Sequence, residues 1–272
     1  MKILFIGDVV GPSGKKALEE YLPGMKRRYR PQLTIVNGEN ITDVGRGINE
    51  QSFKWLLHQG VDVVTLGNHA WDNREIFEFI DESNCLVRPI NLPEETPGKG
   101  VYYVKVNQHE VAIINVLGSV FMSSCIDPFT YLPEVIEEVR QRTPNIFIDF
   151  HAEATSEKEA LGWFLDGQVS AVVGTHTHVQ TNDARILPKG TAYQTDVGMC
   201  GSLDSVIGVN PEDAVRKFTT QMPTRFTPAT SDRLVFSACL VTLDPQTGHA
   251  HHIENIYQTS DNVNRGYQRK FE

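Results

Sequence analysis

The chain has 272 residues, of which 40% are hydrophobic and 22% are charged, a composition typical of a globular protein with a sizeable core. Its formal net charge of −9 argues against bulk nucleic-acid binding and against an anionic membrane as a partner. Four cysteines without a Cys-x-x-Cys pair and the lack of an 18-residue apolar run exclude a disulfide scaffold and a transmembrane helix, so a cytoplasmic protein is expected.

Short apolar runs alternate with amphipathic stretches over most of the chain, which predicts an α/β fold. Strands are expected at residues 3–6, 33–36, 61–66, 111–116, 145–150 and 169–173. Helices are expected at residues 14–30, 49–58, 73–82, 133–143 and 156–165. The last helix is predicted to open with a capping box formed by Ser156 and Glu159.

The pattern changes after residue 190, where an antiparallel region is predicted. Strands are expected at 191–195 and 234–243, and segment 249–258 is the predicted partner of the second strand across a turn at 244–248. Segment 202–232, with one helix near 212–221, is predicted to be a peripheral insertion or cap. No repeat or linker interrupts the chain, which predicts a single domain over residues 1–272.

The motif Gly174-Thr175-His176-Thr177-His178 directly follows the apolar run at 169–173. If that run is a strand, residues two positions apart leave on the same face, so both imidazoles can reach one metal centre or a close pair of centres. Such a pair alone is more often a pair of surface or packed histidines. The other strand ends therefore decide the interpretation.

Several other predicted strands also end in side chains that can bind metals, and open α/β sheets gather their ligand sites at such ends. These side chains are Asp8, Asn37, Glu39, Asn40, Asn68, His69, Asp149 and His151. Each alone could be a cap, a turn residue or a hydrogen-bonded core residue. Together, buried carboxylates and histidines are most economically stabilised by cations, so the sequence predicts a metal site.

Two rival motifs are weaker. A phosphate-binding loop at 11–15 fails on spacing, because Val9 stands at the position of the first glycine and Lys16 at that of the magnesium-binding Ser or Thr. The histidine-rich segment 249–252 has Glu254 as its one nearby carboxylate in the sequence. An exposed hairpin tip explains that segment better than a metal site does.

The order of the strand-end motifs resembles that of the calcineurin-like metallophosphoesterases. Gly7-Asp8, Gly67-Asn68-His69 and the 174–178 motif carry the resemblance, and the fuller sequences at 7–11, 67–72 and 195–199 resemble the bacterial YmdB-type branch. The resemblance implies two mixed sheets packed as a sandwich flanked by helices, a four-layer αββα arrangement. It also implies a dinuclear metal site at the carboxyl ends of the strands, most often with iron or manganese.

This sequence departs from the general family pattern at two ligand positions. Val10 stands where many relatives have a histidine, and Glu39-Asn40 stands where many have a bridging aspartate. The YmdB-type resemblance implies that Glu39 bridges the ions and that Asn40 replaces the missing histidine. It assigns the first ion to Asp8, Glu39, Asn40 and His178, and the second to Glu39, Asn68, His151 and His176. Oxygen and imidazole ligands without a thiolate suit iron, manganese or zinc.

The same resemblance implies a phosphodiesterase whose small-molecule substrates are 2′,3′-cyclic nucleotides. In this hypothesis a hydroxide that bridges the two cations attacks phosphorus, and His69 is not a ligand but donates a proton to the leaving oxygen. The acidic residue that usually follows the Gly-Asn-His motif is absent, with Ala70 there and Asp72 two residues on. A metal-dependent regulatory protein with little turnover and a phosphomonoesterase or nucleotidase remain as alternatives.

Two further groups of residues are weaker candidates: the sequence favours none of the arginines in the first group over the others, and it favours a turn role for the residues of the second group. Three arginines are candidates for contacting a phosphate, and three residues near the predicted strand 191–195 are candidates for approaching the site. They are Arg185, Arg225 and Arg233, and Asp196, Met199 and Ser202, respectively. A homo-oligomer is compatible with the sequence, which indicates neither an oligomeric state nor a protein partner.

Overall fold

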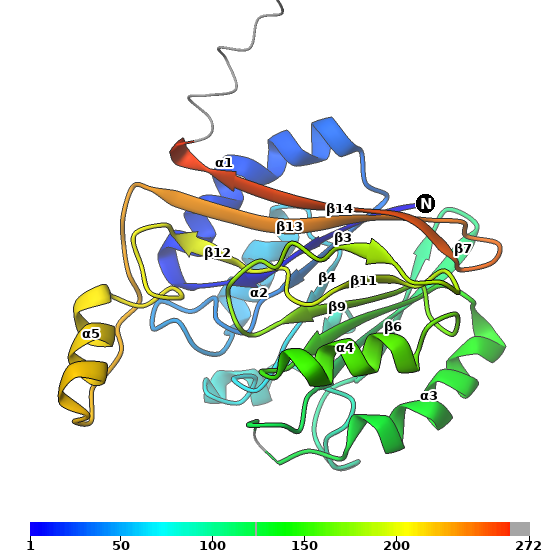
Figure 1. Cartoon of the computed structure of the whole chain (residues 1–272), viewed down its shortest axis with the longest axis horizontal. Helices are drawn as coiled ribbons and strands as arrows, with labels where there is room; N and C mark the ends of the chain where they lie inside the picture. The colour runs from blue at the N-terminus through cyan, green and yellow to red at the C-terminus, as the bar shows by residue number, and fades with distance from the viewer. Residues whose placement is uncertain (123, 262–272) are drawn as a thin grey trace, which may run out of the picture.

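The computed structural model describes residues 1–122 and 124–261, and its strands form two sheets that lie between outer helices (Figure 1). The first sheet contains β1 (Lys2–Ile6), β2 (Asp8–Val9), β3 (Leu33–Asn37), β4 (Val63–Thr65), β5 (Leu86–Val87), β12 (Met199–Ser202), β13 (Leu234–Leu243) and β14 (Ala250–Thr259). Their order is β2-β12-β13-β1-β3-β4-β5, with β14 beside β13. The sheet is mixed, because β1, β3, β4 and β5 are parallel while β13 is antiparallel to both β1 and β14.

The second sheet contains β6 (Val101–Val106), β7 (His109–Leu117), β8 (Ile146–His151), β9 (Ala171–Thr175), β10 (Arg185–Ile186) and β11 (Ala192–Gln194). Their order is β10-β11-β9-β8-β7-β6. The four central strands are parallel, and β6 and β10 pair with them antiparallel at the two edges. This sheet is also mixed, so the predicted α/β chain with two mixed sheets is confirmed.

Both faces of the central strands are covered, which explains their continuous apolar sequences. In β1, Ile3 and Phe5 pack in a cluster with residues of the second sheet, and the Phe5 ring lies 5.3 Å from that of Phe147. Leu4 and Ile6 point to the opposite face, where they pack with helix residues. The alternation follows from the two-residue repeat of a strand and places one apolar core between the sheets.

Helices complete the outer layers. The first sheet is covered by α1 (Gly11–Tyr29) and α2 (Glu50–His58), and the second by α3 (Pro128–Arg142) and α4 (Thr155–Phe164). Figure 1 shows α1 on one side of the two sheets and α3 with α4 on the other. None of the described helices is long and apolar enough to cross a membrane.

Two local predictions are wrong. Segment 73–82 forms only a short 3-10 helix, η1 (Arg74–Glu78), because the core takes up the residues that follow: Phe79 is buried and its ring stacks 6.0 Å from that of Phe53. The capping box is also absent, since α4 begins after Ala154, which has no polar side chain to cap it. Tertiary packing overrides the local signal in the first case.

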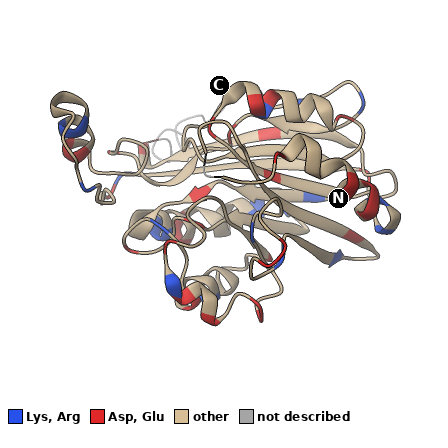
Figure 2. Cartoon of the chain, turned by 90° about the horizontal axis from the view of Figure 1, so that it is seen from below, with Lys and Arg blue, Asp and Glu red and all other residues tan. Residues whose placement is uncertain are grey.

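The predicted peripheral segment 202–232 contains α5 (Pro211–Thr220), whose N-terminus is capped by the side chain of Asn210. This helix lies away from the two sheets in Figures 1 and 2, and the Phe218 side chain is largely exposed. Figure 2 also shows lysines and arginines distributed among acidic residues. The role of 202–232 as an insertion or cap stays a prediction, and the last eleven residues of the predicted single domain, 262–272, lie outside the described part of the chain.

Candidate metal centre

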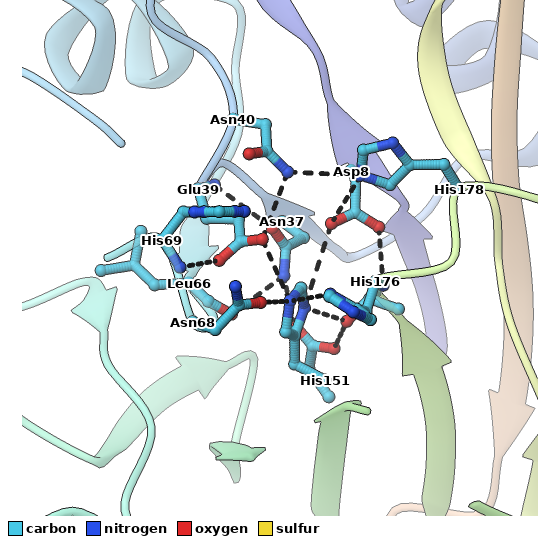
Figure 3. A network of polar contacts seen from close by, with 12 residues as sticks. Asp8, Asn37, Glu39, Asn40, Leu66, Asn68, His69, His151, His176 and His178 are labelled. Atoms are coloured by element: carbon cyan, nitrogen blue, oxygen red, sulfur yellow. Dashed lines mark hydrogen bonds and ion pairs between the residues drawn. The ribbon is translucent and has the colours of Figure 1, made fainter. Parts of the chain in front are cut away.

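The predicted ligands meet where the carboxyl ends of parallel strands from both sheets converge (Figure 3). Asp8 follows β1, Glu39 and Asn40 follow β3, and Asn68 follows β4. On the second sheet, His151 is the last residue of β8, and His176 and His178 directly follow β9. Residues from five strand ends, far apart in the sequence, therefore surround one point.

Glu39, His151 and His176 form the centre of this group. One ligand atom of each lies within 4.8 Å of the others. His151 Nε2 is 3.0 Å from Glu39 Oε1, 3.1 Å from His176 Nδ1 and 2.8 Å from Asn68 Oδ1. The structure thus brings together the four residues that the resemblance assigns to the second ion.

Asp8, Asn40 and His178 lie beside the same glutamate. Asn40 Nδ2 is 3.2 Å from Glu39 Oε1 and 3.3 Å from His178 Nε2, which is in turn 3.8 Å from Asp8 Oδ1. Among the described residues, this buried Asp8 oxygen has no hydrogen-bond partner. Because an unpaired buried carboxylate oxygen is costly, the donor set fits a cation at this position.

The surroundings of these groups set their protonation. Burial raises the pKa of Asp8. Burial opposes ionisation of Glu39, but the adjacent His151 lowers its pKa to about 2. Burial likewise opposes the charge on His151, whereas Glu39 raises its pKa to about 9. At neutral pH the His151 ring therefore carries a proton that a cation would have to replace.

His176 is held in the opposite state. Burial and the neighbouring His151 lower its pKa to about 3, so the ring is neutral and keeps a lone pair for a cation. Its Nδ1 faces His151, while its Nε2 lies 3.1 Å from Glu153 Oε2. No sequence motif pointed to Glu153, because it follows β8 on the exposed side and belongs to no recognisable spacing.

His69 differs from the other histidines of the site. Its backbone N–H donates to Glu39 Oε2 at 2.9 Å, but its ring contacts Asp72, with 2.9 Å between Nδ1 and Oδ2. The side chain is 27% exposed, whereas that of His151 is completely buried. The sequence showed Asp72 only as a displaced acidic residue; the turn at 67–72 brings it onto His69.

The turn that carries His176 and His178 is held in an unfavourable conformation. Both residues have positive φ angles, 97° and 65°, which non-glycine residues rarely adopt. Asp196 supports this turn from the buried side, because it accepts a hydrogen bond from Thr177 N at 3.1 Å and pairs with Lys158 at 2.7 Å. The prediction left open whether Asp196 approaches the site; the structure places it beneath the histidine turn.

The remaining candidates lie outside the cluster. Arg185 pairs with Glu159, and Arg233 pairs with Asp204 and Asp261. Arg225 lines a surface cavity together with Arg46, and none of the predicted metal ligands lines that cavity.

Met199 and Ser202 line a cavity of about 540 Å³ whose wall includes His178. The side chain of Tyr257, which is half exposed, lines the same cavity.

The histidine-rich segment 249–252 is separate from the metal centre. It forms the start of β14 and the turn before it, and His251 and His252 are exposed there. His252 Nε2 lies 3.7 Å from Glu254 Oε2; the His252 side chain is largely exposed and that of Glu254 is partly exposed. The exposed hairpin position expected for this segment is observed.

The chain matches the family model described as YmdB-like protein over residues 4–256. It is 52% identical over 263 residues to the 2′,3′-cyclic-nucleotide 2′-phosphodiesterase of Bacillus subtilis (strain 168), covering 97% of this chain and 99% of that protein. A crystal structure of a hypothetical protein from Thermus thermophilus superposes with a TM-score of 0.89 at 42% identity, covering 95% of this chain and 99% of that one.

A second crystal structure, of a novel phosphatase from Mycoplasma pneumoniae, gives a TM-score of 0.90 at 35% identity and covers 95% of this chain and 93% of that one. The family model and these relatives span nearly the whole described fold, including every strand end of the cluster. They confirm the resemblance stated from the sequence motifs: the chain belongs to the YmdB-like family.

Proposed function

We propose that this protein is a metal-dependent phosphodiesterase that hydrolyses 2′,3′-cyclic nucleotides. The observation that carries the proposal is the buried group around Glu39, in which Asp8 has an unpaired oxygen and two histidines face one carboxylate. The Bacillus subtilis relative, named for this activity, is similar over 97% of the chain, which supports the same substrate class here.

We assign two cations to the cluster, with iron or manganese preferred and zinc as an alternative. Asp8, Glu39, Asn40 and His178 would hold the first, and Glu39, Asn68, His151 and His176 the second. Asn40 turns its amide nitrogen toward Glu39, so half a rotation of the amide would present its oxygen to a cation. Bound cations supply Lewis acidity to the phosphoryl group and lower the pKa of the attacking water.

The chain itself supplies the proton for the leaving oxygen. Asp72 accepts from Nδ1 of His69 and fixes the ring, which leaves Nε2 as the nitrogen available to the substrate. The main-chain bond from His69 to Glu39 ties the ring's position to the carboxylate that would hold both cations. His69 is therefore assigned as the proton donor to the ester oxygen that leaves.

We place the nucleoside part of the substrate in the cavity beside His178. Its volume of about 540 Å³ lies within the range of small-molecule sites, and its lining mixes apolar side chains with amides and hydroxyls. Tyr257 offers an aromatic face within this lining, on which a base can stack. A Tyr257→Ala variant should raise KM for 2′,3′-cyclic AMP severalfold and leave KM for a diester without a base unchanged.

The direct test uses the purified protein with and without Mn²⁺ on three substrates: 2′,3′-cyclic AMP, bis(p-nitrophenyl) phosphate and p-nitrophenyl phosphate. We expect Mn²⁺-stimulated hydrolysis of both diesters, lost with a chelator, and slower hydrolysis of the monoester. Preferential hydrolysis of the monoester would favour the second candidate, a phosphomonoesterase, which the Mycoplasma pneumoniae phosphatase supports. Metal-stimulated hydrolysis of none of them would favour a regulatory protein.

A further inference from the structure

We propose that the hydroxyl of Thr175, backed by the carboxylate of Asp149, is a positioning group for His151. It holds a proton on Nδ1 of that ring and so presents Nε2 to the cation. The inference rests on the proposed metal site, but it gives a specific role to Thr175 and Asp149, which the family resemblance names neither as ligands nor as catalytic residues.

The three residues are brought together by strand register. His151 ends β8 and is paired with Thr175, the last residue of β9, while Asp149 lies two residues earlier on the same face as His151. Thr175 Oγ1 is 2.9 Å from His151 Nδ1 and 2.7 Å from Asp149 Oδ1. All three residues are completely buried, so water does not compete for these bonds.

Thr175 Oγ1 has one proton to share between its contacts with Asp149 and His151, and this sets the directions of the two hydrogen bonds. The other oxygen of Asp149 receives bonds from Thr65 Oγ1 at 2.6 Å and Asn37 Nδ2 at 3.0 Å. A carboxylate surrounded by donors accepts, so Thr175 gives its single proton to Asp149. Its oxygen is then an acceptor for the N–H at Nδ1 of His151.

The other nitrogen of the ring faces the cluster. Nε2 of His151 lies within 3.0 Å of Glu39 Oε1 and Asn68 Oδ1. The remaining carboxylate near Nδ1, that of Asp8, is 3.9 Å away and too distant for a hydrogen bond. When the ring is neutral, a proton fixed on Nδ1 leaves the lone pair on Nε2, directed at the ligand oxygens.

Two variants of Thr175 separate this role from simple packing. Thr175→Val keeps the shape but removes the hydroxyl, and Thr175→Ser keeps the hydroxyl but removes a methyl group. Outer partners of metal-ligating histidines typically contribute about 10- to 100-fold to metal affinity. We therefore expect the Val variant to bind Zn²⁺ about 10- to 100-fold more weakly, measured by competition with a chelator, and the Ser variant to stay close to wild type.

The proposal would be overturned if Thr175→Val bound two Zn²⁺ ions with wild-type affinity. It would also be overturned if Thr175→Ser lost as much Zn²⁺ affinity as Thr175→Val. If the wild-type protein binds no Zn²⁺, both the proposed metal site and the role given to Thr175 fail. If the wild-type protein binds Zn²⁺ but does not hydrolyse diesters, only the proposed catalytic function fails.

A measurement on the wild-type protein covers the case in which the Val variant does not fold. Long-range ¹H–¹⁵N spectra of the Zn²⁺-loaded, ¹⁵N-histidine-labelled protein report which ring nitrogen carries the proton. The His151 signal is identified by its loss in a His151→Asn variant. We expect the proton on Nδ1 and the metal on Nε2; the reverse arrangement would overturn the role given to Thr175.

Discussion

Two histidine-rich segments of this protein look alike in sequence and differ completely in surroundings. His176 and His178 follow β9 and lie among residues from four other strand ends, next to the buried Glu39. The segment 249–252 lies at the start of β14 and in the turn before it, and its exposed His252 has the partly exposed Glu254 as a partner at 3.7 Å.

The difference indicates that burial and neighbouring carboxylates, and not histidine content alone, distinguish a candidate metal centre from an exposed histidine segment. A metal site needs charges that are already desolvated, so that a cation relieves an existing cost. Asp8 offers such a group, because one of its buried oxygens accepts no hydrogen bond from the described residues. The exposed histidines of segment 249–252 are not desolvated, so a cation bound there would relieve little cost. This contrast predicts that substitutions in the two regions change metal binding and diester hydrolysis by different amounts, with the largest loss for a substitution of Glu39.

Removing the Glu39 carboxylate, which is proposed to hold both cations, should abolish the difference in metal binding between the buried group and the exposed segment. A Glu39→Gln variant should lose at least one of two bound metal ions and should lower diester hydrolysis by ~10³-fold or more, because metal stabilisation of the transition state is worth several kcal/mol. Metal content by plasma mass spectrometry and turnover of 2′,3′-cyclic AMP check this. The matched control is Glu254→Gln, which removes the carboxylate beside the exposed histidines and should change neither. Full metal content and normal turnover in Glu39→Gln would refute the bridging role.

Within the buried group, His69 should behave unlike the ligands. A His69→Ala variant should keep its metal ions but lose ~10²–10⁴-fold in rate, the usual contribution of a general acid. The loss should be largest for diesters with poor leaving groups, which need the proton most. His58→Ala, at the exposed end of α2, is the control for loss of an imidazole. Loss of metal from His69→Ala would make this residue a ligand instead.

The metal affinity of the buried group should depend on pH. Burial opposes the charge on His151, but Glu39 raises its pKa to about 9, so the ring is protonated at neutral pH and must lose that proton when a cation binds. Apparent affinity should therefore rise with pH, by up to about tenfold per unit for one displaced proton, between about pH 6 and 8, and level off above the pKa. Zn²⁺ titrations at fixed ionic strength measure this; an affinity that falls with pH in this range would contradict the assignment.

The smallest effect is expected at the second segment. A His251→Ala, His252→Ala double variant should bind the same number of metal ions as wild type and hydrolyse 2′,3′-cyclic AMP within about twofold of its rate, because surface substitutions usually change little. Loss of one ion equivalent from this variant would show that the exposed segment holds metal.

Most strands and helices of the fold were predictable because their signals are local, whereas the arrangement of two sheets between outer helices was expected only from the family resemblance. The buried strands β1, β3, β8 and β9 are short, mostly apolar runs, and polar residues that end or follow these runs meet at the sheet edge. The edge strand β6 was missed, although its sequence begins with the run Val101–Val104, whose four residues are only partly buried. The helix predicted at 73–82 was too long, since the burial of Phe79 depends on a distant partner, Phe53.

The supporting groups of the site were not predictable from spacing. Thr175 and Asp149 meet only through the register of two strands, and Lys158 reaches Asp196 from a helix. Such pairs depend on three-dimensional neighbours that no motif encodes. Residues two positions apart on a strand point to the same face, as was argued for His176 and His178. The same argument places Asp149 on the face of His151, but it does not predict the contact with Thr175.

We infer that two cations bind beside Glu39, one held together with His178 and the other together with His176. Anomalous diffraction at the manganese edge from crystals of the Mn²⁺-loaded protein tests it directly. We predict two anomalous peaks, both within coordination distance of Glu39, and none at residues 249–252. A single peak in the cluster, or a peak at the exposed histidines with the cluster empty, would contradict the account.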